Sequence, residues 1–297
     1  MSPLQVNELF SVKGLVAVIT GGGTGIGLMV ARALDANGAA AVYIVGRRPH
    51  VLEAAAKQGI NGSIIPLPCD ITMKDSLAFI AARVKSEQGY INVLFANAGV
   101  SGANVTKQVL PSYRKPTLSE LHAAMWATPM SDFTKPFAVN VTGTFYTALA
   151  FLALLDAGNT RGNVPQRSNI VVTSSMAGFM RGPSAGSGYA ASKAATTHMV
   201  KQLATYLGPY KIRVNAIAPG IYPSDMTADL YYLNAREGKK LSEEGAVSAD
   251  HIPLERTGSE EDMAGAALFL MSKAGAYVTG NILVTDGGRL GQVPSTY

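Results

Sequence analysis

Short apolar runs alternate with longer amphipathic stretches along most of the chain. The apolar runs predict seven strands, at Leu15–Thr20, Ala41–Val45, Ile64–Cys69, Ile91–Ala96, Ile170–Thr173, Ile212–Ile217 and Asn281–Val284. Amphipathic stretches predict helices at 28–36, 73–88, 131–155, 189–208 and 260–271, with one more ending near Gly59. Strands that are apolar throughout are typical of a parallel sheet covered by helices on both faces. The pattern therefore predicts the α/β fold class.

Two segments interrupt this alternation. Residues 100–136 contain four prolines and the only tryptophan, Trp126, and predict an irregular insertion with one short helix at 118–126 that lines a substrate pocket. Residues 222–257 are polar and include Tyr222, Tyr231 and Tyr232, which we interpret as a substrate lid built on one or two short helices. Since no composition shift marks a linker, residues 1–297 are expected to form a single domain.

Composition excludes several classes of protein. The net charge of +5 comes from scattered residues and short pairs, which does not predict a nucleic-acid surface. The single cysteine, Cys69, excludes an internal disulfide and suits a reducing compartment. No apolar run reaches the roughly 18 residues of a membrane span, and the N-terminus lacks a signal-peptide pattern. We expect a soluble cytoplasmic protein without nucleic-acid or membrane partners.

A glycine-rich turn joins the first strand to the first helix. The run Thr20-Gly21-Gly22-Gly23-Thr24-Gly25-Ile26-Gly27 lets the backbone approach a ligand, and the helix that follows presents free N–H groups. This order of strand, glycine turn and helix predicts a cradle for a phosphate. The alternative is a tight turn that binds nothing.

The end of the second strand indicates which dinucleotide would bind. An acid at this place would accept a hydrogen bond from a ribose 2′-hydroxyl, whereas an arginine accommodates a 2′-phosphate. The sequence has Arg47 and Arg48 there and no acid between Val42 and Leu52, which predicts NADP(H). The alternative is that both arginines are ordinary surface charges. Asp70 ends the third strand, where an adenine would lie.

Four further residues suggest acid–base chemistry. Tyr189 and Lys193 are four residues apart in a predicted helix, so the ammonium is expected beside the phenol, lowering its pKa toward neutrality. Ser175 follows the fifth strand, at the edge where open α/β sheets bind ligands, or it caps a turn. Asn140 lies in an apolar helix and must either satisfy backbone groups or have a function. Each of these residues alone is weak evidence for catalysis.

Together these segments resemble the short-chain dehydrogenase/reductase family over nearly the whole chain. The matching runs are Thr20-Gly21-x-x-x-Gly25-Ile26-Gly27, Asn97-Ala98-Gly99, Asn140, Ser174-Ser175, Tyr189-x-x-x-Lys193, Asn215 with Pro219-Gly220, and Thr279-Gly280 through Asp286-Gly287-Gly288. The resemblance implies a Rossmann-like, doubly wound, seven-stranded parallel sheet and a nicotinamide cofactor. It also implies a catalytic tetrad of Asn140, Ser175, Tyr189 and Lys193.

The resemblance assigns each residue a role. Tyr189 is the general acid/base, Lys193 lowers its pKa and holds the nicotinamide ribose, Ser175 binds the substrate oxygen, and Asn140 anchors a water in the proton relay. It places Asp70 and Asn97 on the adenine side, the backbone of Ile221 at the carboxamide, and Ser224 at the carboxamide or pyrophosphate. The full predicted cofactor set is Gly21, Thr24, Gly25, Ile26, Gly27, Arg47, Arg48, Asp70, Ile71, Asn97, Ala98, Gly99, Tyr189, Lys193, Pro219, Gly220, Ile221 and Ser224, and no metal site is expected.

The sequence thus predicts an NADPH-dependent reductase of a small carbonyl substrate, reversible as an alcohol dehydrogenase. It is similar to fungal members of the family, many associated with secondary metabolism or with the acyl-carrier ketoreductase type. The alternative is a protein of this fold that binds NADP(H) and shapes a reactive intermediate without net reduction. Apolar residues on the helices that contain Asn140 and Tyr189, among them Tyr146, Leu149, Met199, Leu203 and Tyr206, predict a homodimer or homotetramer.

Overall fold

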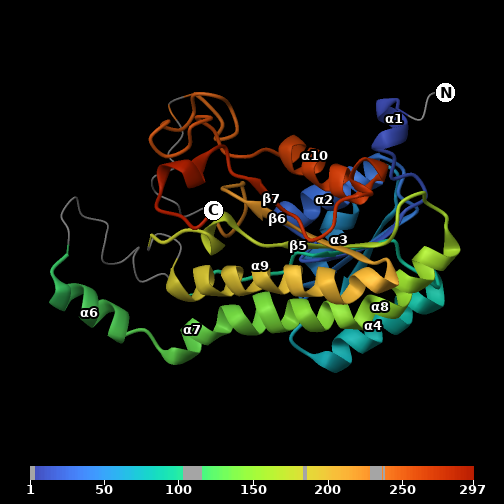
Figure 1. The fold of residues 1–297 in the computed structure, drawn as a ribbon, viewed down its shortest axis with the longest axis horizontal. Coiled ribbons are helices and arrows are strands. Elements are labelled where there is room, and N and C mark those ends of the chain that lie inside the picture. The colour runs from blue at the N-terminus through green and yellow to red at the C-terminus, as the bar shows by residue number, and fades with distance from the viewer. Residues whose placement is uncertain (1–3, 103–115, 183–185, 228–235, 237) are drawn as a thin grey trace.

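One parallel sheet of seven strands organises the molecule (Figure 1). The computed structural model describes residues 4–102, 116–182, 186–227, 236 and 238–297. The strands are β1 (Val16–Thr20), β2 (Ala41–Gly46), β3 (Ile64–Pro68), β4 (Val93–Ala96), β5 (Asn169–Thr173), β6 (Arg213–Pro219) and β7 (Ile282–Thr285), in the spatial order β3-β2-β1-β4-β5-β6-β7. All pairs are parallel. The predicted doubly wound parallel sheet is confirmed, and most strand ends differ from the prediction by only one or two residues.

Helices cover both faces of the sheet. Among the described residues, the α-helices are α1 (Val6–Leu9), α2 (Gly25–Ala36), α3 (Pro49–Ala56), α4 (Lys74–Glu87), α6 (Leu118–Trp126), α7 (Met130–Pro136), α8 (Thr144–Arg161), α9 (Ser187–Leu207) and α10 (Glu260–Met271). Helices α4, α8 and α9 pack on one face, and α2, α3 and α10 pack on the other (Figure 1). Helix α2 starts three residues earlier than predicted because its first turn is formed by the glycine-rich segment itself.

The two apolar cores explain why the strands are not amphipathic. Along β1, Val16 and Val18 belong to the core under α4, α8 and α9, whereas Ala17 and Ile19 belong to the core under α2 and α10. Successive side chains point to opposite faces of a sheet, so every position of a doubly covered strand is buried. Burying each large apolar side chain contributes about 1.5–3 kcal/mol.

The helix predicted over 131–155 is three consecutive segments. Helix α7 ends at Pro136, the π-helical segment η1 covers Phe137–Gly143, and α8 continues to Arg161. Proline lacks a backbone N–H and disrupts regular α-helical pairing, which gives a physical reason for the wider turn. The stretch Met130–Arg161 is long and apolar enough to cross a membrane by length and composition. Here it packs against α4 and α9, as core helices do.

The two interrupting segments agree with their predictions only in part: Val100–Gly102 and Tyr222 line a cavity, but other parts differ. The predicted helix at 118–126 exists as α6, but Trp126 at its end is 82% exposed and stacks on His122, so it does not line a pocket wall. The reason is that α6 buries none of its residues against the sheet. Within the described part of 222–257 the chain forms turns and no α-helix, around a small cluster of Ile221, Ala246, Val247 and Ile252. Tyr231 and Tyr232 lie outside the described residues.

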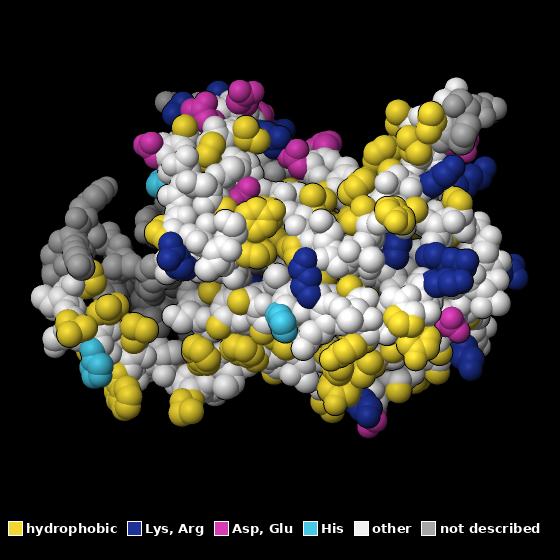
Figure 2. Space-filling model, viewed as in Figure 1, with side chains coloured by type: hydrophobic (Ala, Val, Ile, Leu, Met, Phe, Trp, Pro, Cys, Tyr) yellow, Lys and Arg dark blue, Asp and Glu magenta, His cyan; other side chains and the backbone are white. Residues whose placement is uncertain are grey.

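Charged side chains are dispersed over the surface. Figure 2 shows Lys and Arg in small groups separated by neutral and hydrophobic areas on the face in view. Such a distribution does not form a continuous basic stripe on that face.

Candidate active site

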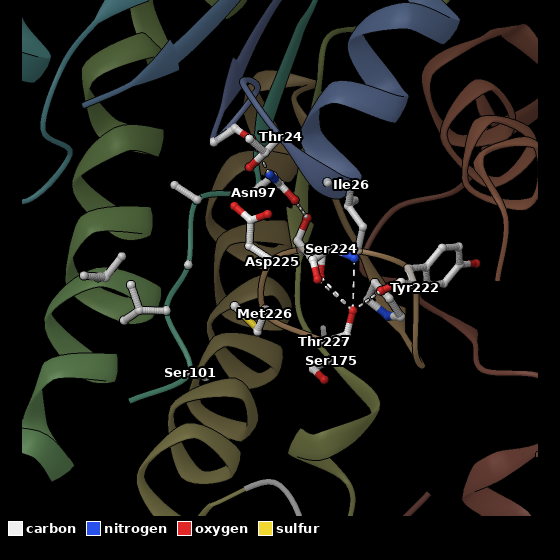
Figure 3. Close-up of a pocket in the computed structure, with 18 of the residues that line it drawn as sticks. Thr24, Ile26, Asn97, Ser101, Ser175, Tyr222, Ser224, Asp225, Met226 and Thr227 are labelled. Carbon is white, nitrogen blue, oxygen red and sulfur yellow. Dashed lines mark hydrogen bonds between the residues drawn. The ribbon is translucent and has the colours of Figure 1, made fainter. Parts of the chain in front are cut away.

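A cavity of about 910 Å³ lies at the carboxyl ends of the strands. Its wall is built by the glycine-rich turn after β1 and by the segments after β2, β3, β4, β5 and β6 (Figure 3). Of the predicted site residues, all but two line this cavity. The exceptions, Gly27 and Asn140, lie behind its wall.

The glycine-rich turn approaches its neighbours too closely for side chains. A Cβ at Gly21 would lie 2.9 Å from the Cα of Ala98, and the φ of Gly21 is +66°. Gly25 has φ +50°, and a Cβ there would lie 3.1 Å from the Cβ of Ser224. Helix α2 begins at this turn, and its N-cap Thr24 makes no side-chain hydrogen bond to the helix. The first N–H groups of α2 are therefore available to an anion in the cavity.

Asn97 holds the glycine-rich turn in place. Its amide nitrogen donates to the carbonyl oxygens of Thr20, at 3.1 Å, and Gly21, at 3.2 Å. Its amide oxygen accepts from the Thr173 hydroxyl at 3.0 Å. A Cβ at Gly27 would come within 2.6 Å of the same amide nitrogen. Gly27 thus shapes the cradle from behind, whereas Asn97 lines the cavity and supports the turn, and its place on the adenine side stays a prediction.

Charged residues occupy the end of the cavity nearest β2 and β3. Arg47 and Arg48 follow β2, and Asp70 follows β3. The backbone N–H of Thr72 donates to Asp70 at 2.9 Å and its hydroxyl at 2.7 Å. These hydrogen bonds, with a smaller contribution from Arg47, lower the pKa of Asp70. Arg48 lies 3.9 Å from Asp225, and both side chains are largely exposed.

The chemical centre lies between β5 and α9. Ser175 follows β5 and lies close enough to the phenol of Tyr189 to affect its pKa, while its hydroxyl oxygen accepts from the backbone N–H of Ala177 at 3.1 Å. Lys193 lies one turn along α9 from Tyr189, with its Nζ 5.8 Å from the centre of the tyrosine ring. That Nζ donates to the carbonyl oxygen of Thr173 at 2.6 Å. The structure therefore brings Ser175, Tyr189 and Lys193 together as predicted.

The acidities of this centre differ from the prediction. Burial raises the pKa of Tyr189, and the Ser175 hydrogen bond only partly opposes the rise. Burial lowers the pKa of Lys193 to about 8. We predicted that the Lys193 ammonium would lower the pKa of the Tyr189 phenol. That prediction is wrong in its direction, because the pKa of Tyr189 is raised. The physical reason is that desolvation disfavours both charged forms, and Lys193 directs its Nζ to the Thr173 carbonyl.

Asn140 supports the centre from the π-helical segment. It is 1% exposed, and its amide oxygen accepts from the backbone N–H of Val100 at 2.9 Å. Its amide nitrogen donates to the Ser192 hydroxyl at 2.9 Å and to the carbonyl oxygen of Val100 at 3.1 Å. The asparagine thereby connects the end of β4 to α9, beside Lys193. These bonds agree with the alternative in which the buried asparagine satisfies backbone groups. That Asn140 anchors a water in a proton relay stays a prediction.

The segment after β6 closes the other side of the cavity. Pro219, Gly220 and Ile221 line it, and the backbone N–H of Gly220 donates to the carbonyl oxygen of Thr285 at 2.9 Å. Ser224 lies next to the glycine-rich turn (Figure 3), and its backbone N–H donates to the Thr227 hydroxyl at 3.0 Å.

Several lining residues had no signal in the sequence. They are Val100, Ser101, Gly102, Val139, Met176, Ala177, Met180, Asp225, Met226, Thr227 and Arg289. Residues of these types are common throughout the chain, and only the fold shows which of them face the cavity. Ser192 does not line the cavity, but its hydroxyl accepts a hydrogen bond from Asn140. Its position inside the Tyr189–Lys193 motif is a signal in the sequence for such a role. Among the described residues, no group of His, Cys, Asp and Glu could hold a metal ion.

A glycine cradle, a helix N-terminus and a Ser–Tyr–Lys centre on one parallel sheet define a dinucleotide-dependent oxidoreductase of the Rossmann class. The chain belongs to the short-chain dehydrogenase/reductase family. A family described as Enoyl-(Acyl carrier protein) reductase matches residues 21–289. The chain is 51% identical to the short-chain dehydrogenase/reductase PhomF of Diaporthe leptostromiformis, over 98% of this chain and 96% of the relative.

Other relatives and solved structures agree with this assignment. The short-chain dehydrogenase/reductase VdtF of Byssochlamys spectabilis is 40% identical, over 99% of this chain and 98% of VdtF. The structure of Pseudomonas aeruginosa RhlG with NADP superposes with a TM-score of 0.76 at 31% identity, over 98% of this chain and 100% of RhlG. A 7α-hydroxysteroid dehydrogenase complexed with NADH superposes with a TM-score of 0.75 at 28% identity, over 96% of this chain and 98% of that chain. The protein is therefore similar to enzymes solved with either nicotinamide cofactor.

Proposed function

We propose that the protein is an NADPH-dependent reductase of a carbonyl substrate that also runs in reverse as an alcohol dehydrogenase. The observation behind this proposal is that Ser175, Tyr189 and Lys193, with Lys193 over the tyrosine ring, line one cavity that also reaches Arg47. This places an acid and a cation at one end of a dinucleotide-sized space.

The cavity fits NADP(H). Gly21 and Gly25 line the cavity, so the backbone of the turn is open to a pyrophosphate there, and the N-terminus of α2 attracts its charge. Arg47 supports the 2′-phosphate form, because a planar guanidinium can donate two hydrogen bonds to a phosphate. Asp70 is a carboxylate on the same side, but the Thr72 backbone and hydroxyl already donate to one of its oxygens. When bound, the reduced nicotinamide supplies the hydride.

The protein's own residues supply the proton and the orientation. The Ser175 hydroxyl would donate a hydrogen bond to the carbonyl oxygen of the substrate, and the Tyr189 phenol would protonate that oxygen. Lys193, held on the Thr173 carbonyl, would stabilise the phenolate that results. Asn140 keeps the end of β4 and α9 in register around this centre.

Replacing Tyr189 tests the proposal. Tyr189→Phe removes the proton donor but keeps the ring, so kcat should fall by about 10²–10⁴ while NADPH affinity is retained. The measurements are NADPH consumption on a panel of ketones and a fluorescence titration of NADPH. Full turnover by the variant would contradict the proposal. A wild-type enzyme that consumes no NADPH on a broad panel would instead favour a binding protein that shapes an intermediate.

We further propose that this reaction takes place in the cytoplasm, as part of secondary metabolism. The buried, unpaired thiol of Cys69 suits a reducing compartment. The similarity to the Diaporthe and Byssochlamys proteins supports a fungal pathway of this kind.

A further inference from the structure

The end of the chain lies against the segment Phe179–Arg181, which follows η2 (Met176–Gly178). Figure 1 places the C-terminus above the beginning of α9. We call residues 293–297 the C-terminal tail. Met180 and Ser295 form an antiparallel bridge, and the backbone N–H of Thr296 donates to the carbonyl oxygen of Phe179 at 2.8 Å. The tail therefore pairs with this segment as a short strand would.

Side chains strengthen this pairing. The rings of Phe179 and Tyr297 meet edge to face, with centres 5.1 Å apart, and the Thr296 hydroxyl donates to the Phe179 carbonyl oxygen at 3.2 Å. On the other side of the bridge, the backbone N–H of Arg181 donates to the carbonyl oxygen of Pro294 at 2.8 Å. An aromatic pair of this kind adds about 0.5–1.5 kcal/mol beyond its buried area.

The tail is also anchored where it leaves the fold. Just before it, the backbone N–H of Leu290 donates to the Asp286 carboxylate at 2.7 Å. Arg289 donates to the carbonyl oxygen of His251 at 2.7 Å and is itself buried. Because both ends are fixed, the tail can hold the segment beneath it in one position.

The segment that the tail holds is a wall of the cavity. Met176, Ala177 and Met180 line the cavity next to Ser175, the residue that would bind the substrate oxygen. Their side chains are apolar, and methionine makes favourable contacts with aromatic rings through its polarizable sulfur. Any part of a substrate that projects past Ser175 toward Met180 would meet this apolar surface.

We propose that the C-terminal tail is part of the substrate site: it braces the apolar wall Met176–Met180, on which a ring adjoining the reacting carbonyl binds. This inference rests on the proposed function for the identity of the carbonyl. It makes Thr296 and Tyr297 positioning residues, and Met176 and Met180 residues that determine specificity.

Binding and turnover are measured separately in a chain that ends at Gln292. The probes are 1-tetralone, a bicyclic aryl ketone that reaches the wall, and 2-butanone, a small ketone that does not. Calorimetry on the protein saturated with NADP⁺ should show a Kd for 1-tetralone about 10-fold higher in the truncated chain, as expected for one lost apolar contact surface. NADP⁺ affinity and the kcat/KM for 2-butanone should stay unchanged.

Point variants separate bracing from general stability. Tyr297→Ala should reproduce the weaker 1-tetralone binding and Tyr297→Phe should restore it, because only the ring contacts Phe179. Tyr277→Ala is the matched control, since Tyr277 is fully exposed. Equal 1-tetralone affinity with and without the tail, no binding to the wild type, or loss of NADP⁺ affinity in both Tyr297→Ala and the truncated chain would overturn the inference. Tail-dependent binding without turnover would contradict the reductase proposal alone.

Discussion

At the scale of single residues, burial determines the acidities of the catalytic centre. Lys193 is 3% exposed, and its pKa is lowered to about 8, whereas the pKa of Tyr189 is raised. The phenol therefore stays protonated over the neutral range, which suits a proton donor in reduction. The lysine is the group that changes charge closest to neutrality.

This difference predicts the pH dependence of reduction. Below pH 8 Lys193 is an ammonium and can stabilise the Tyr189 phenolate, and it loses its proton as the pH rises through about 8. We expect kcat/KM for reduction to be level at lower pH and to decline above about pH 8. Lys193→Arg keeps the positive charge and should move that decline to higher pH. A profile that is level from pH 7 to 10 in the wild type would contradict the assignment.

The lowered pKa of Lys193 also makes the stability of the folded protein depend on pH. The pKa of Lys193 is lower in the folded chain than its ordinary value of 10.5, so the unfolded chain binds more protons between pH 8 and 10.5. The contribution of Lys193 to the free energy of unfolding therefore rises as the pH increases from 8 to 10.5. It is lowest below pH 8.

Arg47 should decide between the two nicotinamide cofactors. Arg47→Ala removes charge-assisted hydrogen bonds to a 2′-phosphate, each worth about 1.5–3 kcal/mol, so the KM for NADPH should rise roughly 10- to 100-fold. The KM for NADH should change little. Arg83→Ala, which removes a surface arginine of α4 paired with Glu87, is the control. Equal losses for both cofactors would defeat the NADP(H) assignment.

At the scale of elements, the contact between η2 and α9 aligns Ser175 with Tyr189. Gly178 ends η2 where it meets the backbone of α9, and a Cβ there would lie 2.8 Å from the carbonyl carbon of Lys193. The close approach needs a residue without a side chain. It also explains how η2 and α9 form one centre.

Gly178→Ala should therefore damage both stability and activity. The added methyl group must displace η2 or α9, which should cost about 1–3 kcal/mol and reduce kcat by moving Ser175. Gly265→Ala is the matched control in α10, where an added Cβ meets nothing within 4 Å and should stabilise the helix by about 0.5–1 kcal/mol. Urea unfolding and steady-state kinetics check both. An unchanged Gly178→Ala enzyme would refute this account of the contact.

At the scale of the whole molecule, α8 and α9 share an apolar groove of about 430 Å³ on the outer surface. Figure 2 shows hydrophobic side chains gathered over these helices. Tyr206 is 64% exposed, and Tyr146 and Leu149 are each 39% exposed. Met199 and Leu203, which we predicted on the same face, line this groove, and most of each side chain is buried. We propose that this groove packs against a second copy of the chain.

Light scattering should then give the mass of a dimer or a tetramer. Tyr206→Glu introduces a charge into the contact and should weaken self-association roughly 10-fold or more. Tyr277→Glu, at a fully exposed tyrosine elsewhere, should leave the mass unchanged. A monomer mass for the wild type would remove the proposal.

Local patterns in the sequence were enough to determine the architecture and the chemical types at the site. Uniformly apolar strands require cover on both faces, a glycine turn before a helix exposes N–H groups, and residues four apart in a helix share a face. These rules involve only neighbours along the chain, so they placed β1 to β7, the Gly21–Gly27 turn and the Tyr189–Lys193 pair without tertiary information.

Only the tertiary structure decided how these parts act on one another. Burial, which depends on the whole fold, reversed the expected direction of the Tyr189 pKa. Packing left Trp126 in solvent and brought Met180 into the cavity wall. The contact between Phe179 and Tyr297 joins residues more than one hundred positions apart. Such long-range contacts form because the sheet fixes where distant segments meet, which no local pattern encodes.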